Sequence, residues 1–151
     1  MILDRAHVPF NLAAVMQELH GRPEFTAPCI AIVALAADED VAGFLKCLLP
    51  HAFRVICTEI RSSGRSYPAN NLNQLATSLG LNSEVEPDPT RALVNGLELA
   101  AKGDRWLSAT GSLALIGAIR GTAIKMHQCV DMGRSEGDFS SLSKMTGPQR
   151  F

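Results

Sequence analysis

The sequence predicts a three-layer α/β domain, in which a mainly parallel sheet of five or six strands has helices on both faces. Apolar segments of strand length alternate with longer stretches whose apolar residues recur every three or four positions. Glycine, proline and aspartate lie where these helices are expected to begin and end. The length of 151 residues suits one domain, and a hydrophobic fraction of 46% suffices for its core. Such β-α alternation is typical of Rossmann-like, parallel sheets.

The N-terminal part predicts a short strand, a helix, a buried strand and a second helix. Residues 1–3 are apolar, and Pro9 begins a helix that ends at Gly21. Residues 29–35 are apolar throughout, as expected of a strand that is buried on both sheet faces. Acidic residues 38–40 favour a helix start, because carboxylates stabilise the positive end of a helix. The two helical faces consist of Leu12, Val15, Met16, Leu19, Val41, Phe44, Leu45 and Leu48.

The C-terminal part continues the alternation. The expected strands are residues 53–58, 83–86 and 105–109. A polar loop over residues 59–68 precedes a helix whose apolar face is Leu72, Leu75, Ala76 and Leu79. Asp88 and Pro89 begin the next helix, as its N-cap and its first residue. After the last strand, the turn Thr110-Gly111-Ser112 leads into a small apolar helix over residues 113–126.

The composition changes after residue 126. Glycine and serine dominate from there, and no apolar periodicity continues. We therefore expect an α/β domain over residues 1–126 and a polar Gly/Ser-rich tail over residues 127–151.

Composition and charge exclude several functional classes. A net charge of -1 and an aromatic fraction of 5% give no basis for nucleic-acid binding. The four cysteines are widely spaced, which excludes a Cys-x-x-Cys zinc site and favours reduced thiols in a reducing compartment. The longest apolar run, residues 29–37, is shorter than a membrane span, and no signal peptide is evident at Met1. We expect a cytoplasmic protein that does not enter membranes.

Candidate binding residues follow the expected strands, because ligands of parallel sheets bind beyond the carboxyl ends of the strands. Asp4 and His7 follow the first strand and could hold a ribose or a phosphate group. On spacing alone the alternative is favoured, in which Asp4 caps the helix that begins at Pro9 and His7 is a loop residue. His20 and His51 have no evident partner in the sequence and are interpreted, like His127, as surface or satisfied histidines.

The remaining candidates each have a structural alternative. Asp38 begins an acidic run that could bind a divalent cation but is more typical of a helix N-terminus in water. Arg61 and Arg65 could clamp an anion or could be solvated. Thr110-Gly111-Ser112 places a helix N-terminus, which suits an anion, at a strand end. No histidine stands near Ser112 to activate it, and no Walker A string occurs, so the residues indicate no catalytic nucleophile and no phosphate cradle.

Five short motifs occur in order over residues 1–120. They are Ile2-Leu3-Asp4-Arg5-Ala6-His7-Val8-Pro9, Ala34 through Val41, Leu48-Leu49-Pro50 with Arg54-Val55-Ile56, Asp88-Pro89, and Thr110-Gly111-Ser112-Leu113. They resemble the LD-x-AHNP, D-K-D, L-L-P, P-D-P and T-G-S-L segments of the C-terminal (glutamate ligase) domain of the folylpolyglutamate synthase and dihydrofolate synthase family, in the Mur ligase superfamily.

The resemblance implies an acid–amino-acid ligase of folate and one-carbon metabolism. In that reaction ATP, a folate and L-glutamate give a γ-linked glutamyl folate, ADP and phosphate through an acyl phosphate. Asp4 and His7 then match nucleotide-contacting positions, and we assign them to cofactor binding. The expected substrate-binding residues are Thr110, Gly111, Ser112, Asp38 and Arg65. No residue is assigned as catalytic or as a metal ligand.

Two positions depart from the family pattern, and one domain is missing. Val8 stands where the family has asparagine, and Glu39 stands where it has lysine. ATP and Mg²⁺ would need the central ATPase domain, so we expect no turnover by this chain alone. Three readings stay open: a fragment, one half of a split enzyme, or a remnant. The alternative function is a non-catalytic binding or assembly module that kept the fold.

Overall fold

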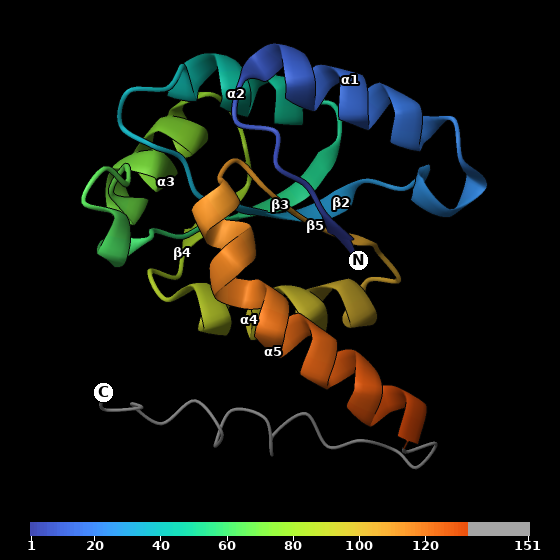
Figure 1. Cartoon of the computed structure of the whole chain (residues 1–151). Coiled ribbons are helices and arrows are strands. Elements are labelled where there is room, and N and C mark those ends of the chain that lie inside the picture. The colour runs from blue at the N-terminus through green and yellow to red at the C-terminus, as the bar shows by residue number, and fades with distance from the viewer. Residues whose placement is uncertain (133–151) are drawn as a thin grey trace.

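The structure is a computed structural model that describes residues 1–132; residues 133–151 lie outside it. Five strands and five helices alternate along the described chain, as the sequence predicts (Figure 1). In order they are β1 (Ile2–Leu3), α1 (Pro9–His20), β2 (Cys29–Val33), α2 (Val41–Leu48), β3 (Ala52–Cys57), α3 (Ala69–Ser78), β4 (Ser83–Val85), α4 (Pro89–Lys102), β5 (Leu107–Thr110) and α5 (Leu113–Met132).

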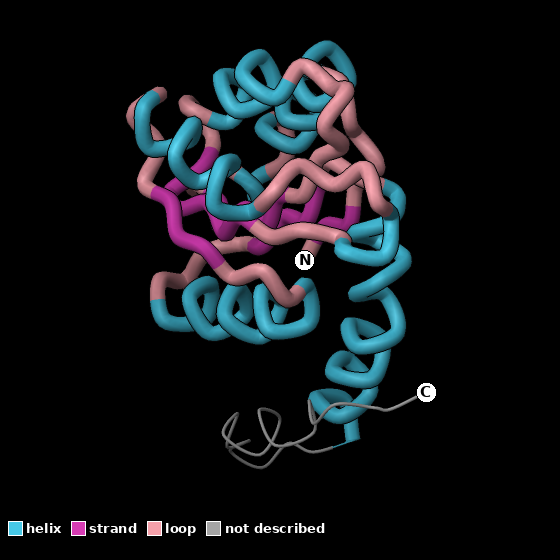
Figure 2. Tube along the Cα trace, turned by 90° about the vertical axis from the view of Figure 1, so that its left-hand side faces the viewer, coloured by secondary structure: helices cyan, strands magenta, loops and turns pink. Residues whose placement is uncertain are grey.

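All five strands are parallel, in the spatial order β1-β5-β2-β3-β4. Helices α1, α2 and α3 cover one face of the sheet, and α4 and α5 cover the other (Figure 1). Figure 2 shows the strands as the middle of three layers. The predicted three-layer α/β fold with a parallel sheet is confirmed.

The central strand β2 is buried on both faces, as its unbroken apolar sequence predicts. Cys29, Ala31 and Val33 pack in the core beneath α1, α2 and α3. Ile30 and Ile32 point to the opposite core, beneath α4 and α5. This alternation follows from the two-residue period of a strand. One strand therefore contributes to both hydrophobic cores.

Helix α5 is longer than its sequence predicts. The sequence predicts an end at residue 126, but the helix continues to Met132, so residues 127–132 are helical. The rest of the expected tail, residues 133–151, lies outside the described residues. The apolar pattern weakens after Met126, yet no glycine or proline occurs between Met126 and Gly133 to end the helix. Residues that do not pack on the sheet can extend a helix that is already nucleated by the packed part.

Cys29 and Cys57 are buried in the sheet and behave as small hydrophobic residues, as expected. Burial raises the pKa of each thiol to about 12, so both stay protonated at neutral pH. Among residues 1–132, no helix has both the length and the apolar character needed to cross a lipid bilayer.

Candidate functional site

Two neighbouring strands, β2 and β5, are followed by connections to opposite faces of the sheet. After β2 the chain passes to α2 on one face, whereas after β5 it passes to α5 on the other face. Because β2 and β5 are neighbours, their diverging connections form a crevice at the carboxyl edge of the sheet. Ligands of open parallel sheets bind in such a crevice. We therefore expect a ligand site among the loops that follow β1, β2 and β5.

Asp4 is fixed at this edge by β5. Its backbone N–H donates to the carbonyl oxygen of Ala109 at 2.9 Å. The hydroxyl of Thr110, which is completely buried, lies 3.4 Å from Asp4 Oδ2 and 3.4 Å from the carbonyl oxygen of Ala6. The N-cap residue of α1 is Val8, and no side chain caps that helix, so the interpretation of Asp4 as its cap is wrong. The half-buried carboxylate stays available to a ligand.

His7 lies between two hollows at the same edge. It is exposed, and its Nδ1 lies 3.2 Å from the carbonyl oxygen of Arg5. With Asp4 and Leu113 it lines a hollow of about 530 Å³. With Ser112 and the loop after β2 it lines a second hollow of about 560 Å³. An imidazole here can therefore contact ligands in either hollow.

The turn after β5 packs against the end of β2. Gly111 has φ 109°, a conformation that L side chains rarely adopt, and a Cβ there would lie 2.5 Å from the carbonyl oxygen of Ala34. Ser112 directly precedes α5, and its Oγ accepts the N–H of Ala114 at 3.1 Å. One of the helix N–H groups that were expected to suit an anion therefore already has a partner.

Asp38 and Arg65 form an ion pair on the far wall of the 560 Å³ hollow. The side chains are 62% and 71% exposed, so the pair contributes little to stability and can open for a ligand. The backbone is held more firmly, since the N–H of Ala37 donates to the carbonyl oxygen of Arg65 at 2.8 Å. Arg61 lines a different hollow, so the structure does not bring the two arginines into one clamp.

The acidic run after β2 is a helix N-terminus, which is the structural alternative. Glu39 Oε2 accepts the N–H of Ala36 at 2.9 Å, and Asp40 Oδ1 accepts the N–H of Gly43 at 2.9 Å as the cap of α2. Within residues 1–132, no three histidine, cysteine, aspartate or glutamate side chains gather where they could hold a metal ion. These carboxylates therefore stabilise the loop and the start of α2.

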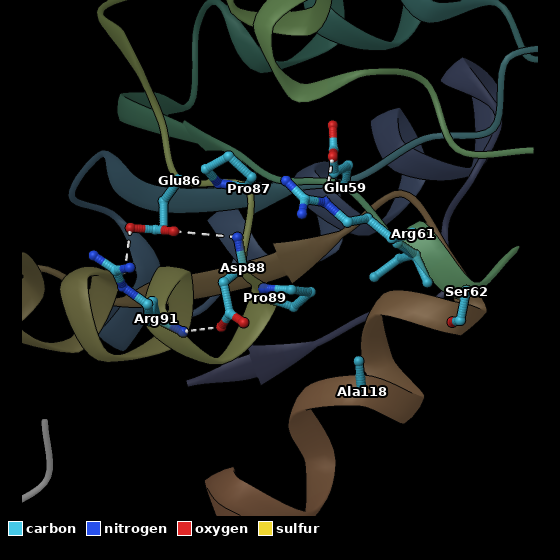
Figure 3. Close-up of a pocket in the computed structure, with 10 residues that line it drawn as sticks. Glu59, Arg61, Ser62, Glu86, Pro87, Asp88, Pro89, Arg91 and Ala118 are labelled. Carbon is cyan, nitrogen blue, oxygen red and sulfur yellow. Dashed lines mark hydrogen bonds and ion pairs between the residues drawn. The ribbon is translucent and has the colours of Figure 1, made fainter. Parts of the chain in front are cut away.

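A third hollow, of about 480 Å³, lies at the ends of β3 and β4 (Figure 3). Four of its charged side chains form ion pairs, Arg61 with Glu59 at 2.9 Å and Arg91 with Glu86 at 3.5 Å. The carboxylate of Asp88 accepts the N–H of Arg91 as the cap of α4. No sequence motif indicates this hollow, because its walls come mainly from two separate connections, after β3 and after β4. The internal pairing leaves no unpartnered charge among these four residues to attract an ionic ligand.

The interactions of Glu59 predict that its carboxylate stabilises the fold at neutral pH and loses this effect in acid. The N–H of Ala69 donates to Glu59 Oε2 at 2.8 Å and, with the Arg61 guanidinium, lowers the pKa of the carboxyl group. A group whose pKa is lowered by folding contributes stability above its unfolded pKa, and that stability is lost as the pH falls through the folded pKa. Glu59→Gln should lower the free energy of unfolding by about 1 kcal/mol at pH 7. Urea denaturation at pH 7 and pH 3 should show the difference shrinking in acid, and an equal difference at both pH values would exclude this role.

No protein-family model matches the sequence, and no curated protein matches it. Solved structures do match. The folylpolyglutamate synthase of Mycobacterium tuberculosis, in complex with ADP, superposes with a TM-score of 0.69 and 26% identity, over 79% of this chain and 28% of that chain. The folylpolyglutamate synthase of Thermotoga maritima gives 0.62 and 26%, over 78% and 26%.

A third match is FolC of E. coli in complex with ADP and without folate substrate. It has a TM-score of 0.69 at 18% identity, over 83% of this chain and 29% of that chain. At this identity the match supports the fold alone. The resemblance to folylpolyglutamate synthases that the motifs predict is confirmed by these structures. This chain spans less than a third of the length of the enzymes that it matches.

Proposed function

We propose that this chain is the C-terminal domain of a folylpolyglutamate synthase-like, ATP-dependent ligase that adds L-glutamate to a folate. The observation that carries the proposal is the position of Asp4. It is fixed beside Thr110, at the crevice between the connections that leave β2 and β5. His7 and Ser112 lie at the same edge and line one hollow. The 26% identical synthase structures support it, although they extend far beyond this chain.

The two neighbouring hollows suit different parts of the reaction. The carboxylate of Asp4 only accepts hydrogen bonds, so it would take ribose hydroxyl groups of a nucleotide, while His7 would donate toward its phosphates. Glutamate carries carboxylates and an ammonium group. Arg65 and Asp38, on the wall of the 560 Å³ hollow, offer the complementary charges, and Ser112 offers a hydroxyl group.

The phosphates need a partner domain. The sequence has no Walker A string, so ATP and Mg²⁺ would be held by a central ATPase domain, with Asp4 and His7 as contacts from this side. When bound, ATP activates a carboxyl group by phosphorylation. The residues of this chain bind and orient the reactants and form no covalent bond. We propose that residues 1–126 form the C-terminal domain of the ligase. We also propose that the protein works in a compartment that contains ATP, folate and glutamate.

A non-catalytic binding or assembly module is the second candidate, favoured by two side chains. Val8 presents an exposed apolar side chain where the family motif has asparagine. Glu39, which replaces a lysine, accepts the N–H of Ala36 and so has a structural role. If this candidate holds, Val8→Asn with Glu39→Lys should recover no activity in a reconstituted enzyme.

Calorimetry with ADP tests the proposed site. The full chain, mixed with the ATPase domain of a folylpolyglutamate synthase, should bind ADP more tightly than that domain alone. Half a site still incurs the full association cost, so the chain alone should bind weakly. Asp4→Asn should weaken binding by about tenfold or more, because hydrogen bonds to a charged group contribute about 1.5–3 kcal/mol.

Glu24→Gln, which neutralises an exposed carboxylate elsewhere, is the matched control and should leave ADP binding unchanged. Equal ADP affinity with and without the chain, or with and without the Asp4 carboxylate, would overturn the proposal.

A further inference from the structure

Two histidines far apart in the sequence contact each other through their ring nitrogens. His20 is the last residue of α1, and His51 lies in the turn between α2 and β3. His20 Nε2 and His51 Nδ1 are in hydrogen-bond contact, and the ring centroids are 4.4 Å apart with a tilt of 38°. Within residues 1–132, neither ring has another hydrogen-bond partner. Each is therefore a satisfied histidine, which is one of the two interpretations that the sequence allows, but the sequence does not identify its partner.

The pair lies at the opposite edge of the sheet from Asp4. The carbonyl oxygen of His51 accepts the N–H of Cys29, where β2 begins, and the N–H of His51 donates to the carbonyl oxygen of Leu48, both at 2.9 Å. The backbone on either side is therefore fixed by regular structure, which holds the two imidazoles together before any ligand binds. The candidate site for nucleotide and glutamate does not use this pair.

We propose that His20 and His51 form a two-imidazole site for a divalent transition-metal ion. In the neutral pair one ring nitrogen carries a proton and donates it to the lone pair of the other. A metal ion would take the place of the bridging proton. The ring that donated this proton would then carry a proton on its other nitrogen, exchanged through water, so that both neutral imidazoles bind the ion through a lone pair. Zn–N bonds of about 2.0–2.1 Å place the two nitrogens roughly 3 Å apart, so the rings would have to move apart from their present contact to admit the ion.

The ligands define the class of ion. Imidazole suits Cu²⁺, Ni²⁺ and Zn²⁺, whereas Mg²⁺ and Ca²⁺ prefer oxygen. Both rings are half-buried, so water can reach the pair and complete the coordination sphere. The Irving–Williams order predicts that Cu²⁺ binds more tightly than Ni²⁺ or Zn²⁺.

Histidine-resolved NMR tests this site. Substoichiometric Cu²⁺ is added to the full chain while the imidazole signals of its four histidines are recorded. The signals of His20 and His51 should broaden first, and those of His7 and His127 should broaden only at higher Cu²⁺. Mg²⁺ should broaden none. Equal broadening of all four histidines, or none of His20 and His51, would refute the site.

Variants on the two elements give an independent readout. Ni²⁺ should raise the Tm of the wild-type chain, because an ion that binds only the folded state stabilises it. His20→Gln and His51→Gln should each weaken Ni²⁺ binding at least tenfold and abolish the Tm shift, with circular dichroism confirming that they fold. His7→Ala is the matched control and should keep the shift. A shift that persists in both glutamine variants would place the ion elsewhere and overturn the proposal.

Discussion

Gly111→Ala should destabilise the domain by about 3 kcal/mol and lower its Tm by roughly 10 °C. Two costs add at this position. The backbone has φ 109°, which is strained for alanine, and the new Cβ would lie 2.5 Å from the carbonyl oxygen of Ala34 and 3.1 Å from Leu35 Cδ2. The carbonyl belongs to the backbone just beyond β2 and cannot rotate aside. The turn after β5 would have to move away from β2, which opens the crevice.

Gly117→Ala is the matched control for this prediction. Gly117 lies within α5, is exposed, and has nothing within 4 Å of an added Cβ. Alanine there should stabilise the protein by about 0.5–1 kcal/mol, because glycine disfavours helix interiors. Thermal unfolding of both variants measures the contrast. Equal Tm values for Gly111→Ala and the wild type would show that the turn does not need its glycine.

Local signals explain why so much of the fold is predictable. Asp88 is expected to cap a helix that begins at Pro89, and its Oδ1 indeed accepts the N–H of Arg91 at 2.8 Å. The apolar run after Pro28 predicts a strand buried on both faces, and β2 is such a strand. Both features depend only on residues that are close together in the sequence, so the sequence alone predicts them.

Contacts between distant residues explain what sequence reasoning missed. His20 and His51 meet because α1 and the turn before β3 end at the same sheet edge, which no spacing along the chain reveals. The interpretation of Asp4 as a helix cap fails for the same reason, since its side chain is near Thr110, which is 106 residues away. A parallel topology places such residues at the same edge of the sheet, but it does not determine which side chains contact each other.

Reconstituted turnover tests most directly whether this chain supplies the C-terminal part of a ligase site. A folylpolyglutamate synthase truncated before its own C-terminal domain is mixed with the full chain, and glutamate addition to folate is followed by ADP release and product mass. Turnover that requires ATP, folate and L-glutamate should rise well above that of the truncated enzyme. With Asp4→Asn it should fall about tenfold or more, while Gly117→Ala should leave it unchanged. Turnover that stays at the level of the truncated enzyme, with the chain folded and present in excess, would contradict the account and favour the non-catalytic module.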